Sequence, residues 1–387
     1  MDSILNAHRT ENCTIRCRRF LTLPKDLGFH PILVTTCSIL ALFAAMGTSC
    51  GTTIPGLPGG TNPPTGTFAG ATVLTYDTNG NAPINGSIVG NQTDFFDLGP
   101  VSPGDRIIIT VDATATSALD PTAAVFDNSA ELFALNDDVD LGAGLFGSAI
   151  NDVVSVGDSH YFLAVAKFFL DNTGGAYQGT VRIERGGAAP TPPIQTLLLN
   201  FAGGNVTIVN EGNFNLPAFD ANDIDPVYAG QTLTIKNRIV AVIQENFTGT
   251  GLVIVSSDTN PSLAPGTFST LHFGAFSSTK FGVADGVDQG NIDRCDDGII
   301  FTNQFDDPFA TQPSVDGIAV AIGNVGAHEA GHLLGLNHVA DITALMDNTG
   351  TASTLLADQD FKTAPLSPSV FPMGMQNAPA YLARIIP

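Results

Sequence analysis

Residues 328–338 read His-Glu-Ala-Gly-His-Leu-Leu-Gly-Leu-Asn-His. In a helix, His328 and His332 are four residues apart and lie on one face. Gly335 lets the chain leave the helix through a left-handed conformation, so that His338 can turn back toward the other two histidines. We therefore predict three imidazole ligands for one zinc ion, with the fourth tetrahedral position open to water.

Glu329 directly follows the first of these histidines. A carboxylate at this position can take a proton from water on the metal without binding the metal itself, which is the general-base role in metal-assisted hydrolysis. The short string His-Glu-x-x-His also arises by chance on amphipathic helices, but here the longer pattern is complete. We predict peptide hydrolysis, with Glu329 as the catalytic base.

The residues after the third histidine extend this pattern. With Ala344-Leu345-Met346 and the preceding Asp341, the sequence resembles the matrixin branch of the metzincin zinc metalloproteases. The resemblance implies that Met346 forms an apolar floor beneath the metal, and ordinary core packing is the alternative role for this side chain. Asp347 and Asn348 stand where matrixins carry an aromatic residue and a proline, so the resemblance implies nothing about specificity.

Residues 1–50 predict an export signal. Basic residues precede an apolar run over residues 31–46, which is too short for a membrane span. Gly47-Thr48-Ser49-Cys50 follows the run and resembles a bacterial lipobox, which implies lipidation of Cys50 and anchoring to a membrane. The alternative is a cleaved and secreted chain, because Gly47 stands where a lipobox usually has leucine.

Charge and cysteine content limit the partners of the chain. The formal net charge is −22, which makes nucleic acid and anionic membrane surfaces improbable partners. Acidic clusters at residues 136–140 and 285–297 offer oxygen ligands for calcium, although solvated turns are the alternative and no EF-hand pattern occurs. After residue 50 the only cysteine is Cys295, which we expect to be buried and unpaired.

Two segments rich in proline and glycine divide the chain. Residues 51–68 predict a flexible tether, and residues 188–193 predict a linker. Between them, residues 69–187 consist of short apolar runs separated by turn residues, which predict an antiparallel β-sandwich domain. Four short motifs of this part resemble the bacterial pre-peptidase C-terminal domain: Asp94-Phe95-Phe96, Gly104-Asp105, Asp120-Pro121 and Asn136-Asp137-Asp138.

Residues 194–387 contain the histidine motif. Patterns typical of a strand at 196–201, a helix at 231–247 and a strand at 251–257 precede it. This order matches the first half of a metzincin catalytic domain. The fold class is therefore predicted to be an α+β metzincin-like domain, with a mixed sheet and helices, preceded by an all-β sandwich. We expect residues from Ile194 onward to fold alone.

Two functions remain from the sequence. The first is an exported zinc-dependent endopeptidase, secreted or lipid-anchored at the bacterial cell envelope, that acts on protein or peptide substrates. The alternative is a cell-surface binding or adhesion protein whose β-sandwich carries the function. The intact Glu329 argues against the alternative, because a silent protease domain is expected to lose its base or a ligand. The oligomeric state does not follow from the sequence.

Overall fold

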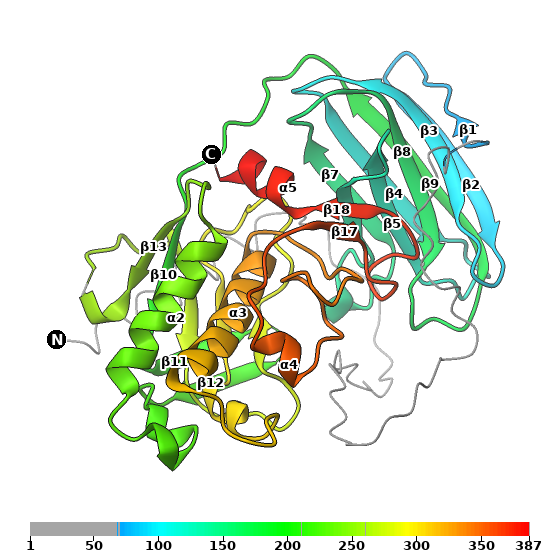
Figure 1. Ribbon diagram of the computed structural model, residues 1–387. Coiled ribbons are helices and arrows are strands. Elements are labelled where there is room, and N and C mark those ends of the chain that lie inside the picture. The colour runs from blue at the N-terminus through cyan, green and yellow to red at the C-terminus, as the bar shows by residue number, and fades with distance from the viewer. Residues whose placement is uncertain (1–67, 69, 210, 260, 387) are drawn as a thin grey trace.

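The computed structural model describes residue 68 and residues 70–209, 211–259 and 261–386. The predicted leader, Cys50 and all but the last residue of the predicted tether lie outside these residues. The described chain is rich in sheet and has few helices, in agreement with the α+β class. Figure 1 shows a β-sandwich beside a part that combines a sheet with helices. None of the described helices has the length and apolar character needed to cross a membrane.

The sandwich consists of two sheets packed face to face. Alternation of apolar side chains directs Ile107, Ile109 and Val111 into the core, where they are fully buried, and directs the residues between them outward. Side chains from both sheets form one hydrophobic core, which is the arrangement of a β-sandwich. In spatial order, the first sheet contains β1 (Thr72–Val73), β3 (Asp94–Val101), β8 (Asp158–Lys167), β5 (Pro121–Asp127) and β6 (Leu132–Asn136). The second contains β2 (Asn81–Ile88), β9 (Gly175–Glu184), β4 (Arg106–Ala113) and β7 (Ser148–Val153).

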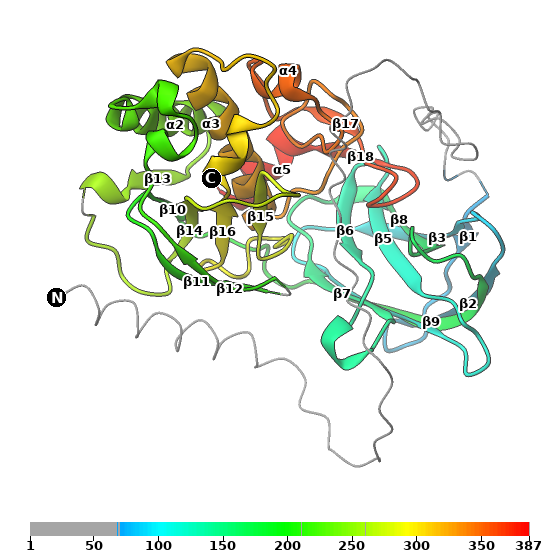
Figure 2. The same cartoon turned by 90° about the horizontal axis from the view of Figure 1, so that it is seen from below.

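The second part is built on a five-stranded mixed sheet. Its order is β13 (Val253–Ser256), β10 (Thr196–Asn200), β14 (Phe268–Phe273), β16 (Asp297–Ile300) and β15 (Gly282–Ala284). The first four strands are parallel, and β15 pairs antiparallel with β16 at the edge. Figure 2 shows α2 (Thr232–Asn246) and α3 (Val315–Leu333) on one face of this sheet, and the hairpin of β11 (Gly204–Ile208) and β12 (Gly212–Leu216) on the other.

Helix α3 lies in the centre of this part. Ser314 caps its first turn by accepting a hydrogen bond from the backbone N–H of Gly317. The helix then packs closely on α2, because a Cβ atom at Gly323 would lie 2.7 Å from the side chain of Val242. Helix α2 spans nearly the same residues as the helix predicted at 231–247. Close packing on α2 helps to fix the position of the histidine motif at the end of α3.

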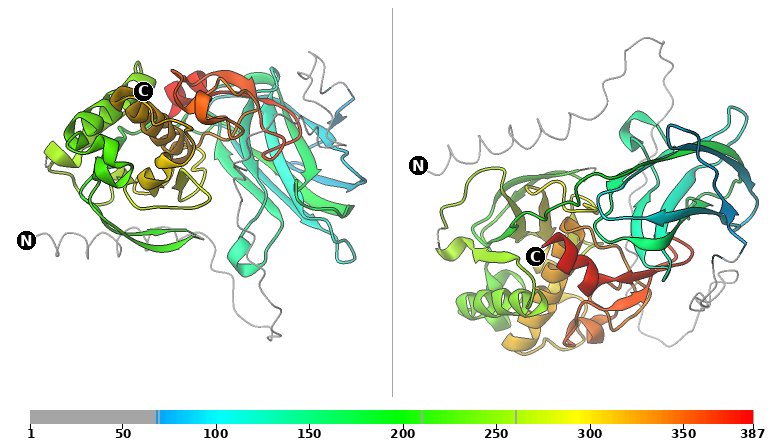
Figure 3. Two further views of the ribbon diagram at one scale, coloured as in Figure 1. Left: turned by 60° about the horizontal axis from the view of Figure 1, so that its bottom comes forward. Right: turned by 90° about the horizontal axis from the view of Figure 1, so that it is seen from above.

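The C-terminal segment returns to the sandwich. After α4 (Ala352–Leu355), the chain forms β17 (Thr363–Pro365), β18 (Met375–Asn377) and α5 (Ala378–Ile385). Both views of Figure 3 show this red segment beside the sandwich strands. Leu366 and Phe371 share a hydrophobic core with Phe126 and Phe162 of the sandwich. The two parts of the chain are therefore joined by apolar packing as well as by the predicted linker.

Cys295 differs from its prediction. It is buried, as expected, with 8% of its surface exposed. However, it is disulfide-bonded, so the prediction of an unpaired thiol is wrong. The prediction assumed that the other four cysteines are removed or modified with residues 1–50, and a disulfide requires a second cysteine.

Candidate metal centre

The end of α3 brings the three histidines together. His328 and His332 lie one turn apart on the helix, which ends after Leu333. Gly335 then adopts a φ of +89°, and its N–H and the N–H of Leu336 donate to the carbonyls of His332 and Gly331. These two bonds form a Schellman motif, which reverses the chain as the sequence predicted. A Cβ atom at position 335 would lie 2.3 Å from the hydroxyl of Tyr381 and 2.6 Å from the carbonyl oxygen of Asp288, so glycine is also required sterically.

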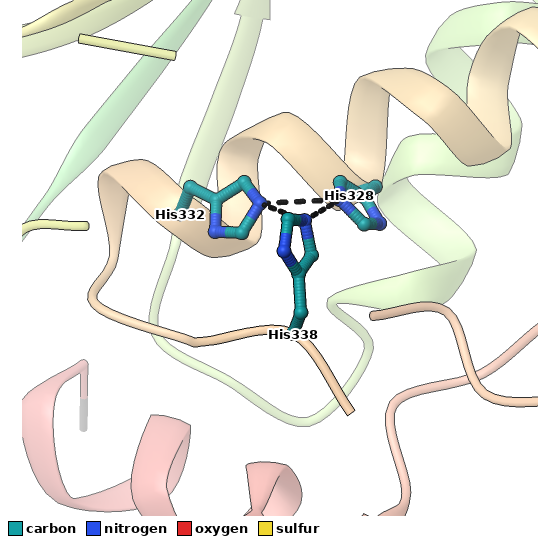
Figure 4. Close-up of side chains that lie close together, drawn as sticks. All are labelled: His328, His332 and His338. Carbon is teal, nitrogen blue, oxygen red and sulfur yellow. Dashed lines mark hydrogen bonds between the residues drawn. The ribbon is translucent and has the colours of Figure 1, made fainter. Parts of the chain in front are cut away.

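The three rings point their Nε2 atoms at one another, as Figure 4 shows. The Nε2–Nε2 distances are 3.1 Å between His328 and His332, 3.0 Å between His332 and His338, and 3.2 Å between His338 and His328. On the other side of the first two rings, Nδ1 lies 2.7 Å from the carbonyl oxygen of Leu345 and of Leu336, respectively. A carbonyl oxygen only accepts, so in the neutral rings Nδ1 carries the proton and Nε2 carries a bare lone pair.

This arrangement fits a tetrahedral metal ion. Two bare Nε2 atoms at 3.1 Å repel each other unless a cation lies between them. Ligands of zinc at about 2.0–2.1 Å in a tetrahedral site are roughly 3.3 Å apart, close to the separations observed here. The backbone acceptors at Nδ1 are the kind of outer contact that orients histidine ligands in zinc sites. The three side chains are thus suited to hold Zn²⁺ through Nε2.

The electrostatic environment keeps the rings neutral. Burial is the main cause that lowers the pKa of His332 to about 3, and the neighbouring His328 contributes to this shift. Burial likewise lowers the pKa of His328, and it lowers the pKa of His338 well below its usual value. Neutral imidazole is the form that binds a metal. The site is therefore ready for a cation near pH 7 without having to release protons.

Glu329 lies between α3 and the edge strand β15. It is buried, with 7% of its surface exposed, and burial raises the pKa of its carboxyl to about 8, an effect that Lys280 opposes. A divalent cation nearby favours the ionised carboxylate and lowers this pKa. Gly282 leaves room for the carboxyl group, because a Cβ atom there would lie 2.5 Å from Oε1 of Glu329.

Met346 packs against the motif helix. It has 2% of its surface exposed, and a Cβ atom at Gly331 would lie 2.6 Å from its sulfur. Its carbonyl accepts a hydrogen bond from the N–H of Val339, the residue after the third histidine. The methionine turn is thus fastened to the segment that carries His338. The position agrees with an apolar floor and with ordinary core packing, so both interpretations of Met346 remain compatible with the structure.

The acidic clusters do not form a comparable group. Among the described residues, only the three histidines bring three or more potential ligand atoms of His, Cys, Asp or Glu within 4.8 Å of one another. In the loop after β15, the pKa of Asp288 is raised to about 7, mainly by burial and in smaller part by the charges of Asp293 and of Asp152 in the sandwich. Calcium binding at these clusters stays a prediction.

Two residues at the centre were not predicted from the sequence. The amide of Asn348 lies beside Nδ1 of His338, with Nδ2 at 3.4 Å. Gln376, from β18, is bonded twice to the backbone of Asn337, accepting from its N–H at 2.7 Å and donating to its carbonyl at 2.8 Å. Asn348 was noted in the sequence only as a departure from the matrixin pattern, without a role at the metal, and no local pattern marks Gln376.

Comparisons with known proteins give only distant likenesses. No family model and no curated protein matches the sequence. Archaemetzincin from Methanopyrus kandleri is 10% identical at a TM-score of 0.26, over 43% of this chain and 88% of that one. A zinc-dependent peptidase from Methanocorpusculum labreanum is 12% identical at a TM-score of 0.24, over 43% and 93%. The pre-peptidase C-terminal domain of a Bacillus anthracis collagenase is 20% identical at a TM-score of 0.23, over 30% and 94%. These low TM-scores decide neither the fold nor the activity of this chain.

Proposed function

We propose that this protein is an exported zinc-dependent endopeptidase with a metzincin-like catalytic part. The observation that carries the proposal is the triangle of Nε2 atoms, in which the carbonyl acceptors at Leu345 and Leu336 leave two lone pairs directed at one point. Zinc bound to His328, His332 and His338 supplies a Lewis acid that polarises a carbonyl and acidifies water. A group with this chemistry, beside a buried carboxylate, suits the hydrolysis of peptide bonds.

Glu329 is the proposed general base. Its carboxylate follows the first ligand in sequence and lies on the side of α3 that faces β15, so it can accept a proton from water without competing for the metal. The same carboxyl group can then donate this proton to the leaving amine. A pKa raised by burial strengthens it as a base, and ionisation next to the cation keeps it in the required form.

The edge strand β15 offers a place for the substrate backbone. Its pairing with β16 uses the N–H and carbonyl groups of Phe281, Val283 and Asp285, so those of Gly282 and Ala284 face the free edge. A substrate in extended conformation can add to this edge as a further strand. Since Gly282 contacts Glu329, such a substrate would run past the proposed base.

One pair of measurements tests this function. We expect one zinc per molecule by elemental analysis, and we expect labelled casein to be cleaved by the wild type. Glu329→Gln should keep the zinc and lose roughly 10²–10⁴-fold in rate, the usual contribution of a general base. Glu245→Gln, on the exposed surface of α2, is the matched control and should cleave normally. Protein without zinc, or an active Glu329→Gln variant, would refute the proposal.

Export is supported by the leader-like pattern of residues 1–50, in which basic residues precede a short apolar run. We propose location at the cell envelope, either secreted or anchored through Cys50. Mass spectrometry of the native N-terminus decides between the two forms. A lipidated Cys50 at the terminus supports the anchor, and an unmodified terminus at another residue excludes it.

A further inference from the structure

The third ligand differs from the other two in its outer contact. Nδ1 of His328 and of His332 each faces a backbone carbonyl, whose position is fixed by the fold. For His338, the polar group at Nδ1 is instead the side-chain amide of Asn348. An amide can present either a donor or an acceptor, so this contact does not by itself fix the proton on the ring.

We propose that Asn348 positions His338 for metal binding by accepting a hydrogen bond from Nδ1–H through its Oδ1 atom. This inference rests on the proposed zinc site. A histidine that binds through Nε2 must carry its proton on Nδ1, and that N–H requires an acceptor. Rotation of the amide by half a turn exchanges its nitrogen and oxygen and places Oδ1 next to Nδ1. Without such an acceptor the ring is favoured in the other tautomer, whose Nε2–H blocks the metal.

The amide is free to take this orientation. In its present orientation Oδ1 of Asn348 is buried and has no hydrogen-bond partner, so no other contact among the described residues opposes the rotation. The backbone of the turn that carries the side chain, in contrast, is well held. Asp347 accepts hydrogen bonds from the N–H and the hydroxyl of Thr349, at 3.0 and 2.8 Å, and bridges to Val339 beside the ligand. The turn therefore holds the amide beside His338 and leaves its two ends interchangeable.

The turn thus has two roles toward the ligands. Leu345 provides the carbonyl acceptor for His328, and Asn348, three residues later, provides the amide for His338. Met346 lies between them and contacts α3. A single turn orients the first and third ligands, while the second is oriented by Leu336 within the motif itself. Removing the acceptor at position 348 should consequently weaken metal binding without unfolding the protein.

The test compares zinc affinities, measured by competition with a chromophoric chelator. Asn348→Leu removes the acceptor and should weaken zinc binding about 10–100-fold, the usual effect of losing an outer-shell partner. Asn348→Asp places a carboxylate beside His338, which accepts hydrogen bonds and does not donate them. This variant should bind zinc at least as tightly as the wild type. Asn246→Leu is the matched control, because Asn246 is also a half-buried amide with an unpartnered Oδ1, but it lies at the end of α2.

A spectroscopic measurement separates positioning from a merely structural role. In zinc-loaded protein labelled with ¹⁵N-histidine, the Nδ1–H signal of His338 should be protected in the wild type and in Asn348→Asp, and lost or shifted in Asn348→Leu. If the wild type holds zinc and Asn348→Leu holds it equally tightly, this inference alone is refuted. Asn348→Asp as weak as Asn348→Leu would refute it too. A wild type that holds no zinc would overturn the proposed function as well.

Discussion

Phe371 offers a direct test of how the two parts of the chain are joined. Its side chain has 1% of its surface exposed, and its ring lies 5.7 Å from that of Phe126 in the sandwich. A buried aromatic side chain removes roughly 150–250 Å² from water. At about 25 cal/mol per Å² this corresponds to roughly 4–6 kcal/mol. The methyl group of alanine stays buried and neighbouring side chains partly fill the cavity, so Phe371→Ala should lower the free energy of unfolding by about 3–5 kcal/mol.

The loss should affect both parts of the molecule. We expect equilibrium unfolding in urea, followed by circular dichroism, to shift as one transition. Hydrogen exchange should then accelerate in β8 and in α3 alike, because β8 shares a core with Phe371, and α3 shares a core with Ala364 of β17, the strand that precedes Phe371. A loss of this size is a large fraction of the about 5–15 kcal/mol typical of a folded domain.

The matched control is Phe169→Ala, which removes the same side chain from a site with 44% of its surface exposed. It should change stability by less than about 0.5 kcal/mol, as surface substitutions usually do. The reasoning would be refuted if Phe371→Ala cost no more than this control. It would also be refuted if only the exchange in β8 accelerated and α3 stayed protected, because the two parts would then unfold independently, as the linker alone suggested.

Four further predictions concern the site and its surroundings. Gly282→Val should keep zinc but lower the cleavage rate at least tenfold, since its Cβ would collide with Glu329; an unchanged rate would contradict the placement of the base. Gln376→Leu leaves two buried backbone groups of Asn337 unpaired, so urea unfolding should show a loss of about 2–6 kcal/mol, at roughly 1–3 kcal/mol per group. The pKa of Asp288 is raised from 3.8 to about 7 in the folded state. Its contribution to the stability of the fold is therefore complete below pH 3.8 and is lost as the pH rises from there to about 7. Asp288→Asn should therefore remove up to about 1.4 kcal/mol per pH unit of this decline, and an unaltered pH dependence of unfolding would argue against it. If calcium binds the acidic loop, millimolar calcium should raise the melting temperature of zinc-loaded protein, whereas no shift would favour solvated turns.

Much of the candidate centre could be predicted because its geometry is local. The four-residue spacing of His328 and His332 places both on one face of any helix, and Gly335 signals the reversal that follows. The hydrogen bonds that orient the ligands could not be predicted in the same way. The contact of Asn348 with His338 depends on which ring nitrogen faces the amide, and sequence spacing does not contain that information.

The fold was predictable to a similar extent. Alternating and helical patterns gave the sandwich, α2 and the strand that precedes it, because each pattern reports which side of one element is buried. The patterns do not show against which of the hydrophobic cores that side packs. Leu366 and Phe371 are apolar residues after the motif, and the sequence alone allows them to pack either with the part that carries the histidines or with the sandwich. The hairpin of β11 and β12 was not predicted, because Asn and Gly residues within it also suit a loop.

The position of the third ligand, His338, depends on both the local geometry of the motif and the packing between the two parts of the chain. His328 and His332 are held by α3 itself, whereas His338 lies on the segment after the helix. In that segment the N–H of Asn337 donates to Gln376, and the carbonyl of His338 accepts from the N–H of Ser367. Both of these partners belong to the segment that returns to the sandwich, where Met375 bonds to the backbone of Ala130. The sandwich therefore helps to hold the C-terminal segment against the metal centre. Because the first two ligands do not depend on this contact, separating the parts should affect the third ligand first, weakening zinc binding before α3 unfolds.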